Sequence, residues 1–407
     1  MAIDFLEASP PKRKRKAPVD LKSVRARLLA IEAQLNDTFV ERQEAIRVIL
    51  LGTLSAQNYL LVGPPGTAKT SVIDCFTMHI DGLRFKCLMG RFTQPDDVFG
   101  GPDIAAFKQS KRATATDGMF TECYFPILDE LLKASDGCTN SLLGVLGPER
   151  EFERKRTKVV CTGAATNWPE VETLSPNAEA FYDRMLLRCS VNAVDRTDKA
   201  KRRALYRAAL AVETYSPVEM VTPQEMIAAA TDVRKVVISD AVIDMLDDLI
   251  GRLLTPRNGK GASAIETTDR RATQLQRILQ VQAWLGGRHE VRIEDFDILR
   301  HGLWAKRRDL ETVNITLANL DAALVQEIDK LANEGRAAYR QLQAQGFGAA
   351  KVNDVTSKIR SIAAEVKQRM EQPVFTTKGR DQVKQIMAAL RADFEELDQR
   401  ATKSAGK

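Results

Sequence analysis

The sequence is poor in the residues that bind structural metals or form disulfide bonds. Only three histidines occur among 407 residues, and they are isolated from one another, which argues against a structural metal cluster. The six cysteines include no Cys-x-x-Cys pair, and several of them lie in apolar, strand-like runs. We therefore expect buried, reduced thiols in a cytoplasmic protein.

Long apolar segments are also absent. Charged residues make up 28% of the chain, and no stretch approaches the roughly 18 uninterrupted apolar residues of a membrane span. The N-terminus lacks the apolar segment of a secretion signal, so we do not expect export. Apolar residues make up 44% of the chain, which is enough for sizeable cores, and its length allows about two or three domains.

Excess positive charge is confined to one short run. The formal net charge is +6, and five positive charges lie between Lys12 and Lys16 (Lys-Arg-Lys-Arg-Lys). The rest of the chain is close to neutral, which gives no support for a basic body that wraps nucleic acid. We interpret residues 1–19, which include three prolines, as a disordered arm. This arm is either a tether to an acidic partner or nucleic acid, or a solvated tail.

Short apolar runs alternate with helical patterns in residues 20–196. Two amphipathic segments come first, at residues 21–35 and 41–54. The alternation that follows predicts an α/β fold, with a parallel sheet and helices on both faces. The expected strands are residues 59–62, 85–88, 124–128, 159–163 and 187–191, and the expected helices between them lie near 70–80, 131–146 and 178–186.

The rest of the chain is expected to be helical. Residues 197–305 predict a small helical domain with a flexible loop at 255–264, where glycine and proline cluster. Residues 306–407 have apolar positions three and four apart, which predict two or three long amphipathic helices or a coiled-coil hairpin. This extension is either a bundle packed on the body or an arm for oligomer or partner binding. The helices expected before it cover residues 199–212, 223–235, 240–254, 269–285 and 293–304.

The strongest motif follows the first expected strand. A Gly/Pro turn opens a helix there, which is the context that a phosphate-binding P-loop requires. The backbone N–H groups of the turn face the phosphates, Lys69 adds positive charge at the β- and γ-phosphates, and the Thr70 hydroxyl coordinates Mg²⁺. Ala68 replaces the usual glycine before the lysine, and we expect it to fit if its φ stays negative. The predicted nucleotide-binding residues of the loop are Gly63, Pro64, Pro65, Gly66, Thr67, Ala68, Lys69 and Thr70.

An apolar run that ends in two acids, from Tyr124 to Glu130, is typical of a Walker B strand. Asp129 would hold the Mg²⁺ shell, and Glu130 would activate the attacking water as a general base. Two acids also suit a helix N-terminus, but the P-loop earlier in the chain favours the catalytic role. Pro126 lies inside the run and suggests a bulge.

A third polar position follows another expected strand. Asn167 ends residues 159–167, and its amide would help to position the attacking water beside the γ-phosphate. The alternative is an ordinary turn residue before Trp168 and Pro169.

Together these motifs resemble an AAA+ ATPase of the MoxR family, most closely its RavA branch. The resemblance covers about residues 25–305 and implies an αβα nucleotide-binding domain over residues 20–196 and a helical lid over 197–305. A C-terminal helical extension over residues 306–407 lies outside it. The resemblance rests on five segments: the P-loop with its alanine, residues 88–100 (Leu-Met-Gly-Arg-Phe-Thr-Gln-Pro-Asp-Asp-Val-Phe-Gly), residues 128–134, residues 141–151 and residues 179–188 (Glu-Ala-Phe-Tyr-Asp-Arg-Met-Leu-Leu-Arg).

The resemblance also implies site residues that the local patterns do not mark. In similar proteins an arginine of the Tyr-Asp-Arg stretch enters the ATP site of the neighbouring subunit. Here that arginine is Arg184, with Arg188 as the alternative. Without the resemblance, Arg184 would be interpreted as an ordinary surface arginine at the end of a helix. The lid arginine that contacts phosphate is Arg270, with Arg271 as the alternative. The adenine is expected between residues 38–46 and the lid, and residues 108–118 are expected to form either a channel-lining or an ordinary surface hairpin.

The predicted activity is hydrolysis of ATP to ADP and phosphate, with Mg²⁺, by a hexameric ring. The resemblance implies chaperone-like remodelling or maturation of a client protein complex, with a partner that carries a von Willebrand factor A domain. This sequence lacks the Asp-x-Ser-x-Ser metal motif of that domain. One rival is a nucleic-acid-directed AAA+ motor or loader that uses the basic arm. Another is a nucleotide-gated scaffold, against which the intact Lys69, Asp129 and Glu130 argue.

Overall fold

The computed structural model describes residues 19–111, 113–168, 176–195, 197–254, 264–345, 349–371 and 377–405. The basic run between Lys12 and Lys16 and the loop expected at 255–264, except for its last residue, lie outside the described residues. In the described part of the chain, no helix has the length and apolar character that a membrane crossing needs.

Five parallel strands form the central sheet, in the order β2-β3-β6-β1-β7. The innermost part of the sheet is apolar, and all four residues of β1 are buried, as expected for a parallel strand that is covered on both faces. The α/β fold with a parallel sheet is therefore confirmed. The strands are β1 (Tyr59–Val62), β2 (Lys86–Leu88), β3 (Ile127–Asp129), β6 (Gly163–Thr166) and β7 (Leu187–Ser190).

Two strands differ from their expected limits by more than one residue. β3 begins after Pro126, so the proline precedes the ladder and no bulge is needed. β6 begins at Gly163 and not at residue 159, because the residues before it form hydrogen bonds with the segment that precedes β3. For example, the Val160 N–H donates to the Tyr124 carbonyl oxygen at 2.8 Å. A Cβ at Gly163 would lie 2.3 Å from the Tyr59 hydroxyl oxygen, so the Tyr59 ring occupies that space.

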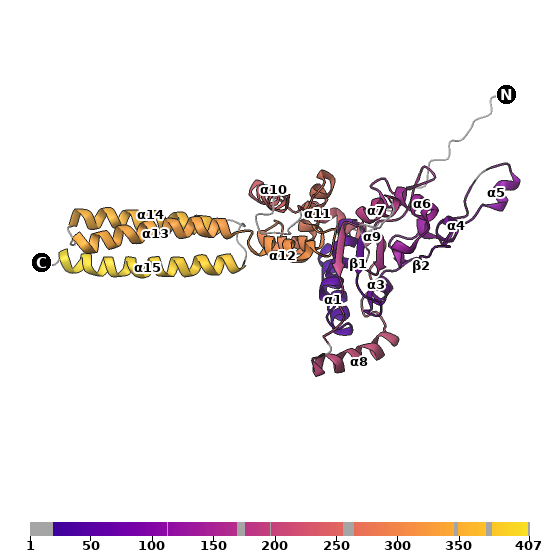
Figure 1. The fold of residues 1–407 in the computed structure, drawn as a ribbon, viewed down its shortest axis with the longest axis horizontal. Helices are drawn as coiled ribbons and strands as arrows, with labels where there is room; N and C mark the ends of the chain where they lie inside the picture. Colours follow the sequence, from indigo (N-terminus) through magenta and orange to yellow (C-terminus); the bar gives the residue numbers. More distant parts are fainter. Residues whose placement is uncertain are drawn as a thin grey trace, which may run out of the picture.

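Helices cover the sheet (Figure 1), and ten of the 13 residues of α2 are buried. The helix expected near 131–146 starts only at Asp136, because Leu131–Lys133 forms a 3-10 turn and Ser135 caps the following helix. The helices of this part are α1 (Leu21–Thr38), α2 (Gln43–Ser55), α3 (Lys69–Met78), α6 (Asp136–Leu146) and α7 (Pro176–Asp183).

An insertion between β2 and β3 carries α4 (Pro95–Phe99) and α5 (Ile104–Lys108). The hairpin expected at 108–118 is reduced to a single antiparallel bridge between Pro102 and Thr114, and Arg112 lies outside the described residues. A short hairpin that we did not expect joins β4 (Glu151–Phe152) to β5 (Lys155–Arg156).

The lid follows the sheet and is helical. The expected limits of α10 and α11 are confirmed, whereas residues 293–301 form a 3-10 helix and not an α-helix. In the described residues after β7, no further strand joins the sheet. The elements are α8 (Lys199–Glu213), α9 (Pro223–Val233), α10 (Asp240–Leu254), α11 (Asp269–Leu285), η4 (Ile293–His301) and α12 (Asp309–Ala318).

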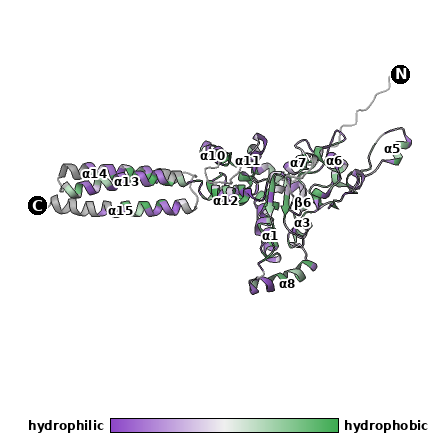
Figure 2. Cartoon of the chain, viewed as in Figure 1, coloured by the Kyte–Doolittle hydropathy of each residue, from purple (hydrophilic) through white to green (hydrophobic). Residues whose placement is uncertain are grey.

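Three long helices, α13 (Ala322–Gln345), α14 (Ala349–Glu371) and α15 (Thr377–Ala405), form a bundle that projects from the body (Figure 1). The bundle has an apolar core of its own, whereas Leu320 still belongs to the core of the body, so this unit begins later than the expected residue 306. Hydrophilic and hydrophobic residues alternate along its helices (Figure 2). The buried residues of its core are Ile328, Tyr339, Leu342, Ile359, Ile362, Val366, Val383, Met387 and Leu390.

Candidate active site

Three motifs that are far apart in the sequence meet at the carboxyl edge of the sheet. β1 runs into the P-loop, β3 ends at Asp129, and β6 is followed by Asn167. The Gly63 N–H donates to the Thr166 carbonyl oxygen at 3.3 Å, which ties the P-loop to the end of β6. In parallel α/β sheets, ligands bind beyond this edge. The structure therefore brings together the residues predicted from the P-loop, the acidic pair and the asparagine.

Glycine is required at two positions of the P-loop for different reasons. A Cβ at Gly63 would lie 2.0 Å from the Val191 carbonyl oxygen, so β7 leaves no room for one. At Gly66 a Cβ would meet no atom within 4 Å, but its φ of 75° is a conformation that glycine adopts most easily. Thr67 closes the turn, because its hydroxyl donates to the Pro64 carbonyl oxygen at 2.9 Å.

Ala68 departs from the negative φ that we expected. Its φ is 61° and its ψ is 20°, which lie in the left-handed region. The turn into α3 requires this conformation, and this is the physical reason for the usual glycine. An alanine there costs roughly 1 kcal/mol or more, which the surrounding loop must offset.

Helix α3 begins at Lys69 without a capping side chain. The first N–H groups of a helix have no partner within the helix, so an uncapped start suits a phosphate anion. Lys69 is buried, and its Nζ donates to the carbonyl oxygens of Gly63 at 2.9 Å and Pro64 at 2.8 Å. Burial lowers the pKa of Lys69, although Glu130 and Asp129 act in the opposite direction.

Thr70 and Asp129 are the predicted metal ligands. The Thr70 hydroxyl donates to Asp129 Oδ1 at 2.9 Å, and the Glu130 N–H donates to the same oxygen at 2.9 Å. A hydroxyl beside a carboxylate is a set of hard oxygen donors, and Mg²⁺ prefers such donors while it keeps positions for water and phosphate. The two residues therefore fit the ion that the motif implies.

Glu130 has a left-handed backbone, with φ 49° and ψ 40°. Strain of this kind clusters at active sites, where the surrounding structure holds it in place. Both carboxylate oxygens lie 3.5 Å from Asn167 Nδ2, and one lies 3.3 Å from Lys133 Nζ. Asn167 Oδ1 is buried and has no hydrogen-bond partner on the chain. Glu130 and Asn167 thus offer a water molecule the carboxylate as an acceptor, the amide Nδ2 as a donor and the amide Oδ1 as a second acceptor. The sequence did not predict the contact between Glu130 and Lys133.

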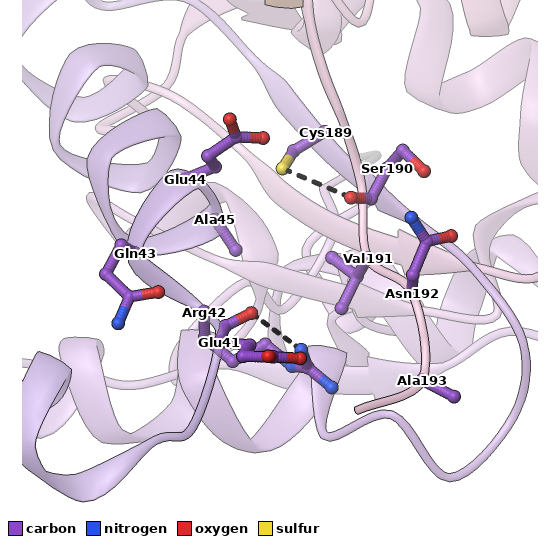
Figure 3. Close-up of a pocket in the computed structure, with 10 residues that line it drawn as sticks. All are labelled: Glu41, Arg42, Gln43, Glu44, Ala45, Cys189, Ser190, Val191, Asn192 and Ala193. Atoms are coloured by element: carbon purple, nitrogen blue, oxygen red, sulfur yellow. Dashed lines mark hydrogen bonds between the residues drawn. The ribbon is translucent and has the colours of Figure 1, made fainter. Parts of the chain in front are cut away.

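A pocket of about 280 Å³ lies beside the P-loop (Figure 3). Residues 41–45 at the start of α2 form one wall, within the segment expected to contact adenine. The opposite wall is formed by residues 189–193 at the end of β7, and no lid residue that the structure describes lines the pocket. Arg42 joins this pocket to the P-loop, because its Nε donates to the Thr67 carbonyl oxygen at 3.0 Å. Nothing in the local sequence marks Arg42 for this role.

The lid reaches this region through His301. One potential ligand atom each from Glu44, Cys189 and His301 lies within 4.8 Å of the others, a grouping that the isolated histidines did not predict. Glu44 is already paired with Arg300, at 3.4 Å. His301 is buried, and burial together with the charge of Arg300 lowers the pKa of its ring to about 4.

We expect His301 to make stability depend on pH. A histidine in the unfolded chain has a pKa of about 6.5, whereas His301 in the folded protein has a pKa of about 4. Between these pH values the unfolded chain binds a proton at His301 and the folded protein does not. The free energy of unfolding should therefore fall by up to about 1.4 kcal/mol per pH unit across this window. Urea denaturation at pH 7.5 and 5.5, followed by tryptophan fluorescence, should show a smaller loss in His301→Gln; equal losses would contradict the assignment.

A second polar cluster lies at the opposite, amino end of the strands. Asn58, which precedes β1, is buried and donates to the carbonyl oxygens of Leu146 and Arg184 at 3.0 and 3.1 Å. Its Oδ1 accepts a hydrogen bond from Arg150 at 2.8 Å. Arg270 is exposed at the start of α11 and close enough to lower the pKa of Arg150, after the larger effect of burial. The sequence pattern did not reveal Asn58 as the centre of this cluster.

The position of this cluster changes how Arg184 and Arg270 can act. We expected Arg270 to hold phosphate alongside Lys69, but the full length of β1 lies between the arginine cluster and the P-loop of the same chain. Four residues of strand span roughly 13 Å. A role for either arginine at a phosphate therefore requires the P-loop of another subunit.

The two alternative arginines are locked into the interior. Arg188 is buried, donates to the Trp304 and Tyr182 carbonyl oxygens at 2.6 and 2.9 Å, and stacks over the Tyr182 ring. Arg271 donates to the Gly302 carbonyl oxygen at 2.6 Å and pairs with Asp183 at 3.5 Å. Both hold the lid against the sheet domain. Arg270 is exposed, whereas Arg184 is half-buried and its Nη1 donates to the Ala180 carbonyl oxygen of the preceding turn at 2.8 Å.

The architecture can now be compared with known proteins. Residues 26–231 match the family model described as the MoxR domain in the MoxR-vWA-beta-propeller ternary systems. This chain belongs to the MoxR family. Residues 241–317 match an AAA lid domain, which agrees with the packing of α12 in the body and confirms the AAA+ architecture.

Relatives of this MoxR protein include two uncharacterized proteins of Methanocaldococcus jannaschii. One is 28% identical over 308 residues, which are 74% of this chain and 76% of the relative. The other is 26% identical over 370 residues, which are 88% of this chain and 95% of the relative. The crystal structure of a presumed ATPase from Cytophaga hutchinsonii has a similar fold, with a TM-score of 0.58 and 19% identity over 73% of this chain and 96% of its own.

Proposed function

We propose that this MoxR protein hydrolyses ATP. One observation carries the proposal: Lys69, Thr70, Asp129, Glu130 and Asn167 converge on the carboxyl edge of the sheet, beside an uncapped helix start and a pocket large enough to hold part of a nucleotide. Each of these side chains has the chemistry that one part of phosphoryl transfer requires.

The division of work follows from the contacts. The P-loop N–H groups and the Lys69 ammonium bind the β- and γ-phosphates, with the base of the nucleotide in the pocket that Arg42 borders. Thr70 and Asp129 hold Mg²⁺, which neutralises charge that develops on the phosphates. Glu130 accepts a proton from the attacking water, and Asn167 orients that water through its amide. The strained backbone of Glu130 fixes the carboxylate in this position.

The arginine cluster completes the site from a neighbouring copy. Because Arg184 and Arg270 lie at the far end of the strands from their own P-loop, we propose that both contact the nucleotide of the next subunit. A guanidinium there stabilises the charge on the transferred phosphoryl group. Contacts of one face with a different face of the next copy close into a ring, and we propose a hexamer.

We further propose that hydrolysis drives chaperone-like remodelling or maturation of a client complex. Arg271 and Arg188 couple the lid to the start of β7, and we propose that a change at the nucleotide is transmitted through this strand to the lid. The family description places such domains in systems with a von Willebrand factor A protein, and this supports a partner of that kind. The projecting bundle, with its separate core, is the surface that we assign to partner binding.

Substitution of Lys69 by alanine tests the binding step. The variant loses a charge-assisted contact with phosphate, so its affinity for a fluorescent ATP analogue should fall by about 10- to 100-fold. The matched control is Lys330→Ala, which removes an exposed lysine from the bundle and should bind as the unchanged protein does. If Lys69→Ala binds the analogue with unchanged affinity, the P-loop is not the nucleotide site.

A further inference from the structure

Helix α8 stands apart from the body of the molecule (Figure 1). None of its residues is buried, and the side chains of Tyr206 and Leu210 are 69% and 67% exposed. The ion pair between Lys201 and Glu41 is one of its few ties to the body. An amphipathic helix that leaves large apolar residues in solvent marks a surface for another molecule.

Five of the exposed residues of α8 share one face of the helix. Lys199, Arg203, Tyr206, Arg207 and Leu210 occupy positions i, i+4, i+7, i+8 and i+11, which places them on a single helical face. We call these five residues the basic stripe. In the part of the chain that the structure describes, its three charged members form no ion pair.

Helix α10 has an exposed face whose charge is opposite to that of the basic stripe. Its inner face, which includes Leu246 and Leu249, packs into the core of the body. Its outer face presents Asp240, Ile243, Asp244 and Asp247, at positions i, i+3, i+4 and i+7, and we call these four the acidic stripe. All four are exposed, and none of its aspartates is ion-paired among the described residues.

The two helices match in length, and their stripes are opposite in charge. Each helix has 15 residues, which is about 22 Å of helix. Each stripe combines charges of one sign with exposed apolar residues, and the signs are opposite. α8 and α10 lie on opposite sides of the body in Figure 1, so each stripe is presented to a different neighbour. Such heterologous contacts are those that build rings.

We propose that the basic stripe of one copy packs against the acidic stripe of the next copy. Arg203 and Arg207 pair with Asp244 and Asp247, and Tyr206 and Leu210 cover Ile243. α8 leaves the body just after the pocket at residues 189–193, whereas α10 belongs to the lid whose next helix carries Arg270. This contact rests on the ring of the proposed function, because it joins the face that binds ATP to the face that supplies the arginines. A nucleic acid or an acidic partner on α8 would leave the acidic stripe without a role.

Charge exchange between the stripes tests the contact. Two variants of the full chain, Arg203→Glu with Arg207→Glu and Asp244→Arg with Asp247→Arg, each place like charges opposite one another. Analytical ultracentrifugation with a non-hydrolysable ATP analogue should show that each variant needs about tenfold more protein for half assembly. Combination of all four substitutions in one chain should restore assembly to within about threefold of the unchanged protein.

Controls separate this contact from general effects of charge. Lys358→Glu with Lys367→Glu makes the charge change of the α8 variant on exposed positions of the bundle and should leave assembly unchanged. Circular dichroism confirms that each variant folds. The proposal is overturned if the single-helix variants assemble normally, if the four-substitution chain assembles no better than they do, or if the unchanged protein does not assemble. Binding of fluorescent ATP to the same samples is a separate readout, so loss of the ring contact is distinguished from loss of the ATP site.

Discussion

Substitution of Glu130 by glutamine should stop ATP turnover while ATP stays bound. Glutamine keeps the shape of the side chain and its place beside Asn167, but it cannot accept the proton of the attacking water. A general base contributes typically about 10²- to 10⁴-fold, so the steady-state rate of phosphate release should fall by at least about 100-fold. The affinity for ATP should change by less than about threefold, because Glu130 does not bind the phosphates in the mechanism that we propose.

The matched control for this experiment is Glu334→Gln, which makes the same chemical change on an exposed position of α13. It should leave both turnover and affinity unchanged. Phosphate release from Glu130→Gln at the unchanged rate would show that another group activates the water. Because this variant holds ATP, it is also the form with which a client or a von Willebrand factor A partner should be captured.

The second large effect is expected at Arg184. Its replacement by alanine should lower turnover by about 10³-fold or more, the range measured for arginines that act on the transferred phosphoryl group from a neighbouring chain. Binding of ATP to the P-loop should remain, since Arg184 lies at the other end of the strands of its own subunit. Phosphate release and binding of a fluorescent ATP analogue, measured on the same preparation, separate the two properties.

Mixtures show whether Arg184 acts between subunits. An Arg184→Ala chain supplies an intact P-loop, and a Lys69→Ala chain supplies an intact arginine. After random assembly of equal amounts, about one quarter of the interfaces join these two intact parts, so turnover should recover to as much as about a quarter of the original. A mixture as inactive as its components would argue that the arginine does not act from the neighbouring subunit.

Much of the nucleotide site was predictable because its motifs are local. The P-loop is a strand, a turn and a helix in consecutive residues, and Asp129 and Glu130 end an apolar run. The limits of α10 and α11 were also predicted correctly, since both helices have a continuous apolar face and Thr268 caps α11. The β4–β5 hairpin was missed, because Glu153 and Arg154 adopt positive φ values without the asparagine or glycine that usually marks such a turn.

The sequence by itself determined which residue types could perform the chemistry and the order in which they occur. Only the tertiary structure decided which of them are exposed to a second molecule. Arg184 and Arg188 are only four residues apart, and Arg270 and Arg271 are adjacent. In each pair the second arginine donates to a carbonyl group of a distant segment: Arg188 to Trp304, and Arg271 to Gly302. Burial and hydrogen bonding depend on residues that are remote in sequence, so no local pattern can separate an arginine that is held by distant segments from one that is not.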